Sequence, residues 1–332
     1  MELTTVTQQV VSNHEVESSS ISNNNKFIEA NTQQVTLSHL RQDCTIPIFA
    51  KDNESTIPHF EFIGAVREIA QELFPERTVM MANIRTSHII KGRIPSAIGK
   101  PAKELLEHEK TIYYERMAFM VEIPHIHTYI NNQKLNLTVG GVRSYSEQNL
   151  FSKKSIEKFK IFIGFKNMVC CNLCIATDGL KDDLRVSSVE ELKSKTRELF
   201  LTYNQENQLE TMQELQEYTI NQEQFAHLIG KMKLYHHLDK QQKQQLFELK
   251  TTDSQINTIV KNYIDDPHFS ADNDGYITLW NLYNLFTESS KSNYIDNFLC
   301  RNCNTYEFVN HLGAAIKNKK DNYFLQDHDI VQ

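Results

Sequence analysis

The spacing of apolar residues changes near residue 183, and this change constrains the fold more than any other feature of the chain. From about residue 79 to 177, apolar side chains recur at every second position, which is the period of a strand with one buried face. The pattern is clearest in YYERMAFMVEI at 113–123 and EKFKIFI at 157–163. Beyond TDGLKDD at 177–183 the period becomes helical. The sequence therefore predicts an α+β fold, with a mainly antiparallel sheet in the N-terminal half and an all-helical C-terminal half.

Composition and local signals divide the chain into three parts. Residues 1–26 are rich in Ser, Asn, Gln and Thr, which predicts a disordered tail. A strand-rich α+β domain is expected over 27–183, with one packing helix near 62–73 and a short helical interruption at 103–110. A helical domain or extension is expected over 184–332, and it opens with a capping box formed by Ser188 and Glu191.

The totals exclude several classes of protein. The chain has 332 residues, of which 40% are hydrophobic, and it contains no apolar run long enough for a transmembrane helix. The first residues lack the pattern of a secretory signal, so we expect a cytoplasmic protein without a membrane partner. Six cysteines in a chain of this length are expected to be thiols.

Charge is distributed unevenly along the chain. Residues 85–166 carry fourteen Lys and Arg against seven Glu, although the whole chain has a formal net charge of −7. A basic middle between acidic flanks makes a nucleic-acid-binding face possible in an acidic protein. The alternative is that these lysines simply cover solvated strands.

Two segments concentrate the cations, RTSHIIKGRIP at 85–95 and FSKKSIEKFK at 151–160. Strand periodicity places Lys158, Lys160 and Phe162 on one face, where lysines can contact phosphates while a base stacks on the ring. The predicted nucleic-acid-binding residues are Arg85, Lys91, Arg93, Arg143, Lys153, Lys154, Lys158, Lys160 and Phe162.

Three cysteines crowd NMVCCNLC at 167–174, and a second CxxC pair stands at Cys300 and Cys303. Read as a strand, this segment places Cys171 and Cys174 on opposite faces, where they cannot share one zinc ion. We therefore expect a buried strand that begins after GFKN and uses cysteine as a small hydrophobe, with no metal site and no cofactor. Asn172 would be an amide within an apolar run, and it would need hydrogen-bond partners.

Other site patterns are incomplete. SADNDGYITLWN at 270–281 resembles a calcium loop, but Asn281 stands where the bidentate glutamate is required. We expect only a turn at Asp274–Gly275 and a helix capped by Thr278. The stripe of Trp280, Tyr283 and Phe286 has the spacing of core packing. No catalytic signature is present, so no catalytic residue is assigned. The sequence therefore favours a protein without enzymatic activity.

Several separated segments carry a resemblance to known families. They are GRIP at 92–95, YYERMAFMVEIP at 113–124, GGV at 140–142, VCCNLC at 169–174, QFAHLIG at 224–230 and LWNLYNLFT at 279–287. The chain resembles an uncharacterised domain-of-unknown-function family of bacterial chromosomes and mobile elements. The motif residues Cys171, Asn172, Cys174, Trp280, Tyr283, Asn284 and Thr287 are also similar to those of phage/plasmid-like proteins. The resemblance carries no established activity, and its mobile-element context implies nucleic-acid handling or counter-defence.

Three functions follow as hypotheses. The first is a non-catalytic accessory protein that binds nucleic acid, with single-stranded DNA as the preferred partner. The second is an interaction or counter-defence factor that binds a host or mobile-element protein through the acidic helical half and the tail. The third is an enzyme of a class that the order of residues does not reveal. The sequence does not indicate an oligomeric state.

Overall fold

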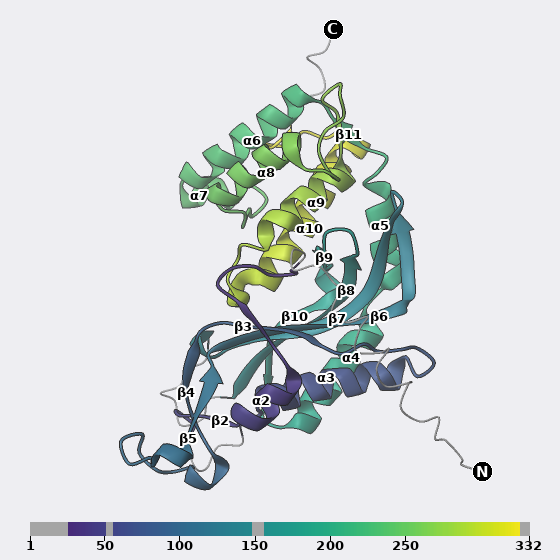
Figure 1. The fold of residues 1–332 in the computed structure, drawn as a ribbon. Coiled ribbons are helices and arrows are strands. Elements are labelled where there is room, and N and C mark those ends of the chain that lie inside the picture. Colours follow the sequence, from purple (N-terminus) through teal and green to yellow (C-terminus); the bar gives the residue numbers. More distant parts are fainter. Residues whose placement is uncertain (1–25, 51–55, 148–155, 326–332) are drawn as a thin grey trace, which may run out of the picture.

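The computed structural model describes residues 26–50, 56–147 and 156–325. Its centre is a curled antiparallel sheet of seven strands, in the order β1-β3-β6-β7-β8-β10, with β9 also paired to β8 (Figure 1). The strands are β1 (Gln33–Val35), β3 (Asn83–Thr86), β6 (Arg116–Ile130), β7 (Gln133–Ser144), β8 (Glu157–Asn167), β9 (Leu173–Cys174) and β10 (Leu180–Val186).

The two faces of the sheet follow the alternation of the sequence. Phe119, Val139 and Ile161 face the main core, against α3 (His59–Leu73) and α4 (Val189–Thr202). Pro58 precedes α3, and the side chain of Ser188 accepts a hydrogen bond from Glu191 N, which caps α4. Aromatic packing of Phe62 on Phe119, at a ring distance of 5.1 Å, joins α3 to the centre of the sheet.

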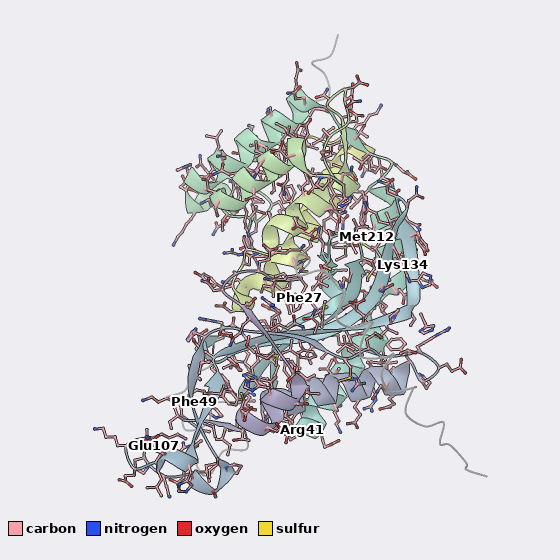
Figure 2. The ribbon with its side chains drawn as sticks, in the orientation of Figure 1. Phe27, Arg41, Phe49, Glu107, Lys134 and Met212 are labelled. Atoms are coloured by element: carbon pink, nitrogen blue, oxygen red, sulfur yellow. The ribbon has the colours of Figure 1, made fainter. Side chains whose placement is uncertain are left out.

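The opposite face is also covered. Ala118, Met120, Val142 and Phe162 pack against the first turns of α10 (Ile295–Asn318) and against the segment around Phe27. Figure 2 shows Phe27 between α10 and the sheet. We call these surfaces the α3 face and the α10 face.

Helices α5–α10 form the upper part of the molecule in Figure 1. They are α5 (Gln205–Glu214), α6 (Gln222–His237), α7 (Lys240–Lys243), α8 (Asp253–Asp265), α9 (Leu279–Ser290) and α10. Two short strands, β11 (Thr219–Ile220) and β12 (Ile277–Thr278), pair antiparallel and tie the α5–α6 turn to the α8–α9 turn. The main core continues from the sheet into these helices.

A smaller sheet projects from the other end of the molecule (Figure 1). It contains β2 (Ile46–Pro47), β4 (Ile89–Arg93) and β5 (Lys110–Tyr114), paired in the order β2-β4-β5. The segment between β4 and β5 includes two 3-10 turns, at Pro95–Ala97 and Glu107–Glu109. We call residues 89–114 the arm. Helix α2 (Leu37–Asp43) packs beside it.

The predicted fold class is confirmed, and several local expectations are corrected. The helical interruption expected at 103–110 is only a 3-10 turn at Glu107–Glu109. The expected break at GFKN does not occur, because β8 continues to Asn167. The predicted tail lies almost wholly outside the described residues. The boundary near 183 stays a prediction, although α4 beyond it packs beside α3.

Candidate nucleic-acid interface

Two of the predicted phosphate contacts instead hold the backbone of the chain. Arg85 is buried and donates hydrogen bonds to the carbonyl and hydroxyl oxygens of Thr32 at 2.6 and 2.8 Å. Arg93 is buried as well, and its guanidinium donates to the carbonyls of Ile48 and Ala50, both at 2.6 Å. Because these donors are already used inside the protein, neither arginine presents its charge to a phosphate.

Arg143 is the most enclosed of the predicted contacts. Its guanidinium pairs with Glu157, donates to the carbonyl of Ile57, and lies 4.3 Å from the ring of Tyr145 and 4.7 Å from that of Phe159. The side chain is fully buried. A charge this enclosed is retained only with partners of this kind, so Arg143 has a structural role at the end of β7.

Lys158 and Lys160 lie beside carboxylates. Lys160 is buried and its ammonium group is 2.8 Å from Glu147 and 3.4 Å from Asp182. Lys158 is 3.9 Å from Glu147 and 3.6 Å from Asp183. Three acids around two lysines leave no excess of positive charge here. This part of β8 therefore does not form the cationic strip that the sequence predicts.

Phe162 does not offer its ring for the base stacking that the sequence predicts. The alternation placed Phe162 correctly on the face opposite Phe159, but α10 covers that face and leaves the side chain 1% exposed. Lys153 and Lys154 lie outside the described residues. Lys91, on the arm, is exposed and has no ion-pair partner in the part of the chain that the structure describes. Its role in nucleic-acid binding stays a prediction.

The two motifs of the resemblance meet in space. Asn172, just before β9, donates from its side-chain amide to the carbonyl of Asn284 on α9 at 3.0 Å. Asn167, the last residue of β8, donates to the side-chain oxygen of Asn284 at 3.2 Å. All three asparagines are buried. The expected partner is found for the amide nitrogen of Asn172, whereas its side-chain oxygen has none among the described residues.

Helix α9 completes this network. The side-chain amide of Asn284 donates to the carbonyl of Trp280 at 2.9 Å, and the hydroxyl of Thr287 lies 3.1 Å from the carbonyl of Asn284. The indole of Trp280 donates to Gln133 at the start of β7. Tyr283 is also buried, beside Trp280. These residues join the sheet to the helical half. Because they are buried, we assign them a role in stabilising the fold rather than in contacting a ligand.

The segment with three cysteines is a tight hairpin, not the extended strand that the sequence predicts. Cys171 has a φ of 62°, in the left-handed region, and its N–H donates to the carbonyl of Asn167 at 2.8 Å. Cys170 and Cys174 lie on the main core as expected, and burial raises the pKa of the Cys174 thiol to about 12. No disulfide and no metal-binding group of His, Cys, Asp or Glu occurs among the described residues.

The backbone of Cys171 gives a direct test of this turn. We expect Cys171→Asn to change the free energy of unfolding by less than about 0.5 kcal/mol, because asparagine tolerates a left-handed backbone. Cys171→Val should lower it by about 2 kcal/mol, because a β-branched side chain is strained there. Urea unfolding of the two variants measures the difference. Equal stabilities would contradict the turn.

The calcium-loop look-alike is held by its own side chains. Asp272 accepts hydrogen bonds from the N–H groups of Asp274 and Tyr276, at 3.0 and 2.8 Å, and Gly275 has a φ of 80°. The hydroxyl of Thr278 accepts from Asn281 N at 3.1 Å and caps α9. The predicted turn and cap are confirmed.

The most exposed aromatic surface of the sheet lies at the end of the β6–β7 hairpin. His127 and Tyr129 point away from the core on β6, with ring centroids 5.8 Å apart, and Lys134 stands opposite Tyr129 on β7. Lys134 has no ion-pair partner within the described ranges. His125 is also exposed, in an irregular stretch between Ile123 and His127 where the strand register shifts. Figure 2 shows Lys134 at the edge of the molecule.

Backbone geometry fixes how these side chains are presented. Asn131 and Asn132 have φ values of 50° and 59°, as a two-residue hairpin turn requires. His127 Nδ1 lies 3.0 Å from the carbonyl of Pro124 and donates to it, so Nε2 faces outward. The sequence signal for this surface is the alternation of HIHTY at 125–129, which places His125, His127 and Tyr129 on one side of a strand.

Comparison with protein families decides the classification. The model of a family described as "Domain of unknown function, B. Theta Gene description (DUF3871)" matches residues 7–325. The chain belongs to this family. No curated protein and no solved structure matches it. Membership in DUF3871 confirms the resemblance to an uncharacterised family. No helix among the described residues is long and apolar enough to cross a membrane.

Proposed function

We propose that this protein is a non-catalytic nucleic-acid-binding accessory protein that prefers single strands. The observation that carries the proposal is the exposed end of the β6–β7 hairpin, where Tyr129 is 59% exposed beside His127 and Lys134. An aromatic ring beside an uncompensated cation suits a nucleotide, because the ring stacks on the base and the ammonium group attracts the phosphate.

The spacing of the hairpin favours an extended strand over a duplex. Side chains two residues apart on a strand are separated by about 6.7 Å, and bases of an extended single strand can be accommodated at such steps. In a duplex the bases are stacked on one another, so their faces are not available to Tyr129. Stacking on a ring also requires no particular base, which fits an accessory role without sequence preference.

The proposal also includes the origin and the location of the protein. A mobile-element origin rests on the resemblance of Cys171, Asn172, Cys174, Trp280, Tyr283, Asn284 and Thr287 to the motifs of phage/plasmid-like proteins. A cytoplasmic location is carried over as the expectation from the sequence. The alternatives are a counter-defence factor that binds a host protein through the acidic helical half, and an enzyme of unrecognised class.

Fluorescence anisotropy with labelled oligothymidylate tests the proposal. We expect binding at low salt, weaker binding to the duplex of the same length, and a steep loss of affinity with salt because bound counterions are released. Tyr129→Ser should weaken binding about tenfold, since base–aromatic stacking contributes about 1–3 kcal/mol. Lys134→Gln should reduce the slope of log affinity against log salt by about 0.7–0.9.

A matched tyrosine provides the control. Tyr294, before α10, is 60% exposed and has no side-chain capping bond, so Tyr294→Ser removes an equally exposed ring elsewhere. It should leave the affinity unchanged. No binding of the full chain to any oligonucleotide at low salt would refute the proposal, as would equal losses in the Tyr129 and Tyr294 variants.

A further inference from the structure

Two exposed surfaces at opposite ends of the molecule carry opposite charge. The first is the arm, residues 89–114, which holds five Lys and Arg against three Glu. The second is the turn between α8 and α9, residues 264–276, which holds four Asp and no Lys, Arg or Glu. We call this turn the acidic loop. In Figure 1 the arm projects from the lower left, and the acidic loop lies at the upper end beside β11.

Each surface also exposes large apolar side chains, which is unusual beside so many charges. Leu106 on the arm is 55% exposed, and Ile89 and Ile98, at other points of the arm, are also exposed. On the acidic loop, Ile264 is 73% exposed and Tyr276 is exposed beside the aspartates. A surface with both apolar and like-charged residues is suited to a partner of opposite charge, because burial of the apolar groups and Coulomb attraction then act together.

Two of the five cations on the arm are free to meet a partner, because Arg93 is buried and Lys100 and Lys110 pair with Glu109 and Glu107. Lys91 and Lys103 are exposed, and neither has an ion-pair partner among residues 26–50, 56–147 and 156–325. The arm itself is firmly held, because Arg93 donates to the carbonyl of Lys100 at 2.7 Å and Glu109 accepts from Leu106 N at 2.9 Å. A preformed surface loses less conformational entropy on binding than a flexible one.

The acidic loop also has exposed, unpaired charges on a fixed backbone, but these charges are negative. Asp265, Asp272 and Asp274 are exposed, and none forms an ion pair within the described part of the chain. The hydroxyl of Tyr263 donates to the carbonyl of Gly275 at 2.6 Å, and Asp272 holds two backbone N–H groups of the turn. The loop is therefore also fixed before any partner arrives.

We infer that the arm of one copy docks on the acidic loop of a second copy. The charge complementarity between two surfaces of the same chain argues for a second copy as the occupant. Because the two surfaces differ, the contact is heterologous, and repeated docking produces an open head-to-tail chain rather than a closed dimer. The inference does not depend on nucleic-acid binding.

Sedimentation velocity of the full chain tests this contact. At low salt the weight-average mass should rise with concentration above the monomer value of 38.7 kDa, and high salt should return it to that value because the Debye length shortens to about 3 Å at 1 M. Leu106→Ser should also reduce the association, since it removes exposed apolar surface from the arm.

Charge reversal identifies the surfaces. A variant with Lys91→Glu and Lys103→Glu, and a second with Asp272→Lys and Asp274→Lys, should each remain monomeric alone. Mixing the two should restore association, and so should combining all four changes in one chain. Asp272 also accepts backbone hydrogen bonds, so circular dichroism is used to check that the variant with Asp272→Lys and Asp274→Lys is folded. If that variant is unfolded, a variant with Asp265→Lys and Asp274→Lys takes its place.

Each outcome of this experiment bears on the inference. A wild-type chain that stays at the monomer mass at low salt up to several hundred micromolar overturns it. Association that persists unchanged in both reversed variants also overturns it, because the contact then lies elsewhere. A mixture that fails to associate while the wild type does so shows that another partner surface is used.

Discussion

Asn284→Ala is expected to lower the free energy of unfolding by about 3 kcal/mol, because it removes two buried hydrogen bonds and leaves a cavity in place of the side chain. The side-chain oxygen of Asn284 accepts from Asn167, and its amide donates to the carbonyl of Trp280. Alanine can replace neither function, and the site is fully buried, so water does not reach the groups that remain. Urea unfolding followed by far-UV circular dichroism measures the loss.

A double-mutant cycle with Asn167→Ala separates this network from general damage to the core. Asn167 and Asn284 are in contact, so the loss in the double variant should be smaller than the sum of the single losses by about 1 kcal/mol. The control is Asn257→Ala, which removes an exposed asparagine on α8 and should cost less than about 0.5 kcal/mol. A loss below about 1 kcal/mol for Asn284→Ala would contradict the structural role of the motifs.

Acidification from pH 6.5 to pH 5 is expected to lower the free energy of unfolding by about 2 kcal/mol through His59 alone. Burial, together with the neighbouring Arg143 charge, lowers the pKa of His59 to about 3. The unfolded chain takes up this proton near pH 6.5, whereas the folded chain does not until about pH 3. Stability contributed by neutral His59 is therefore complete above pH 6.5 and is lost between pH 6.5 and 3.

The surroundings of His59 explain why it stays neutral. Its ring stacks on Tyr113 with centroids 4.7 Å apart, and Nε2 donates to the carbonyl of Tyr114 at 2.9 Å. Urea titrations at several pH values measure the effect. His59→Gln should flatten the dependence between pH 6.5 and 5, whereas His237→Gln, at an exposed position on α6, should leave it unchanged. The same slope in both variants would contradict a buried neutral His59.

Periodicity predicted which residues of β8 share a face, but not what covers each face. Phe159 and Ile161 do face the main core, and Phe162 does point the other way. The sequence cannot show that α10, more than a hundred residues later, packs on that second face. Lys160 illustrates the same limit, because a lysine in a strand has the same local pattern whether it meets water or Glu147.

The asparagine motifs and the cysteine segment show two further limits. Asn172 and Asn284 were singled out, yet their contact joins residues 112 apart, which no local pattern reveals. The turn before β9 contains no glycine or proline, and Cys171 adopts its positive φ because of contacts made by the fold. The helix caps at Thr278 and Ser188 were predicted because their signals are local, whereas the pairing of β11 with β12 in the same half was not.

Photo-crosslinking is the most direct test of where a single strand binds. The proposal places it on the end of the β6–β7 hairpin, and not on the side of β8 that carries Lys158, Lys160 and Phe162. The full chain is bound to an oligonucleotide that contains 5-iodouridine, irradiated and digested, and the cross-linked residues are identified by mass spectrometry. We predict that cross-links concentrate at Tyr129 and His127 and are lost with Tyr129→Ser. Cross-links at Phe162 or within 156–163, with none on the hairpin, would contradict the account.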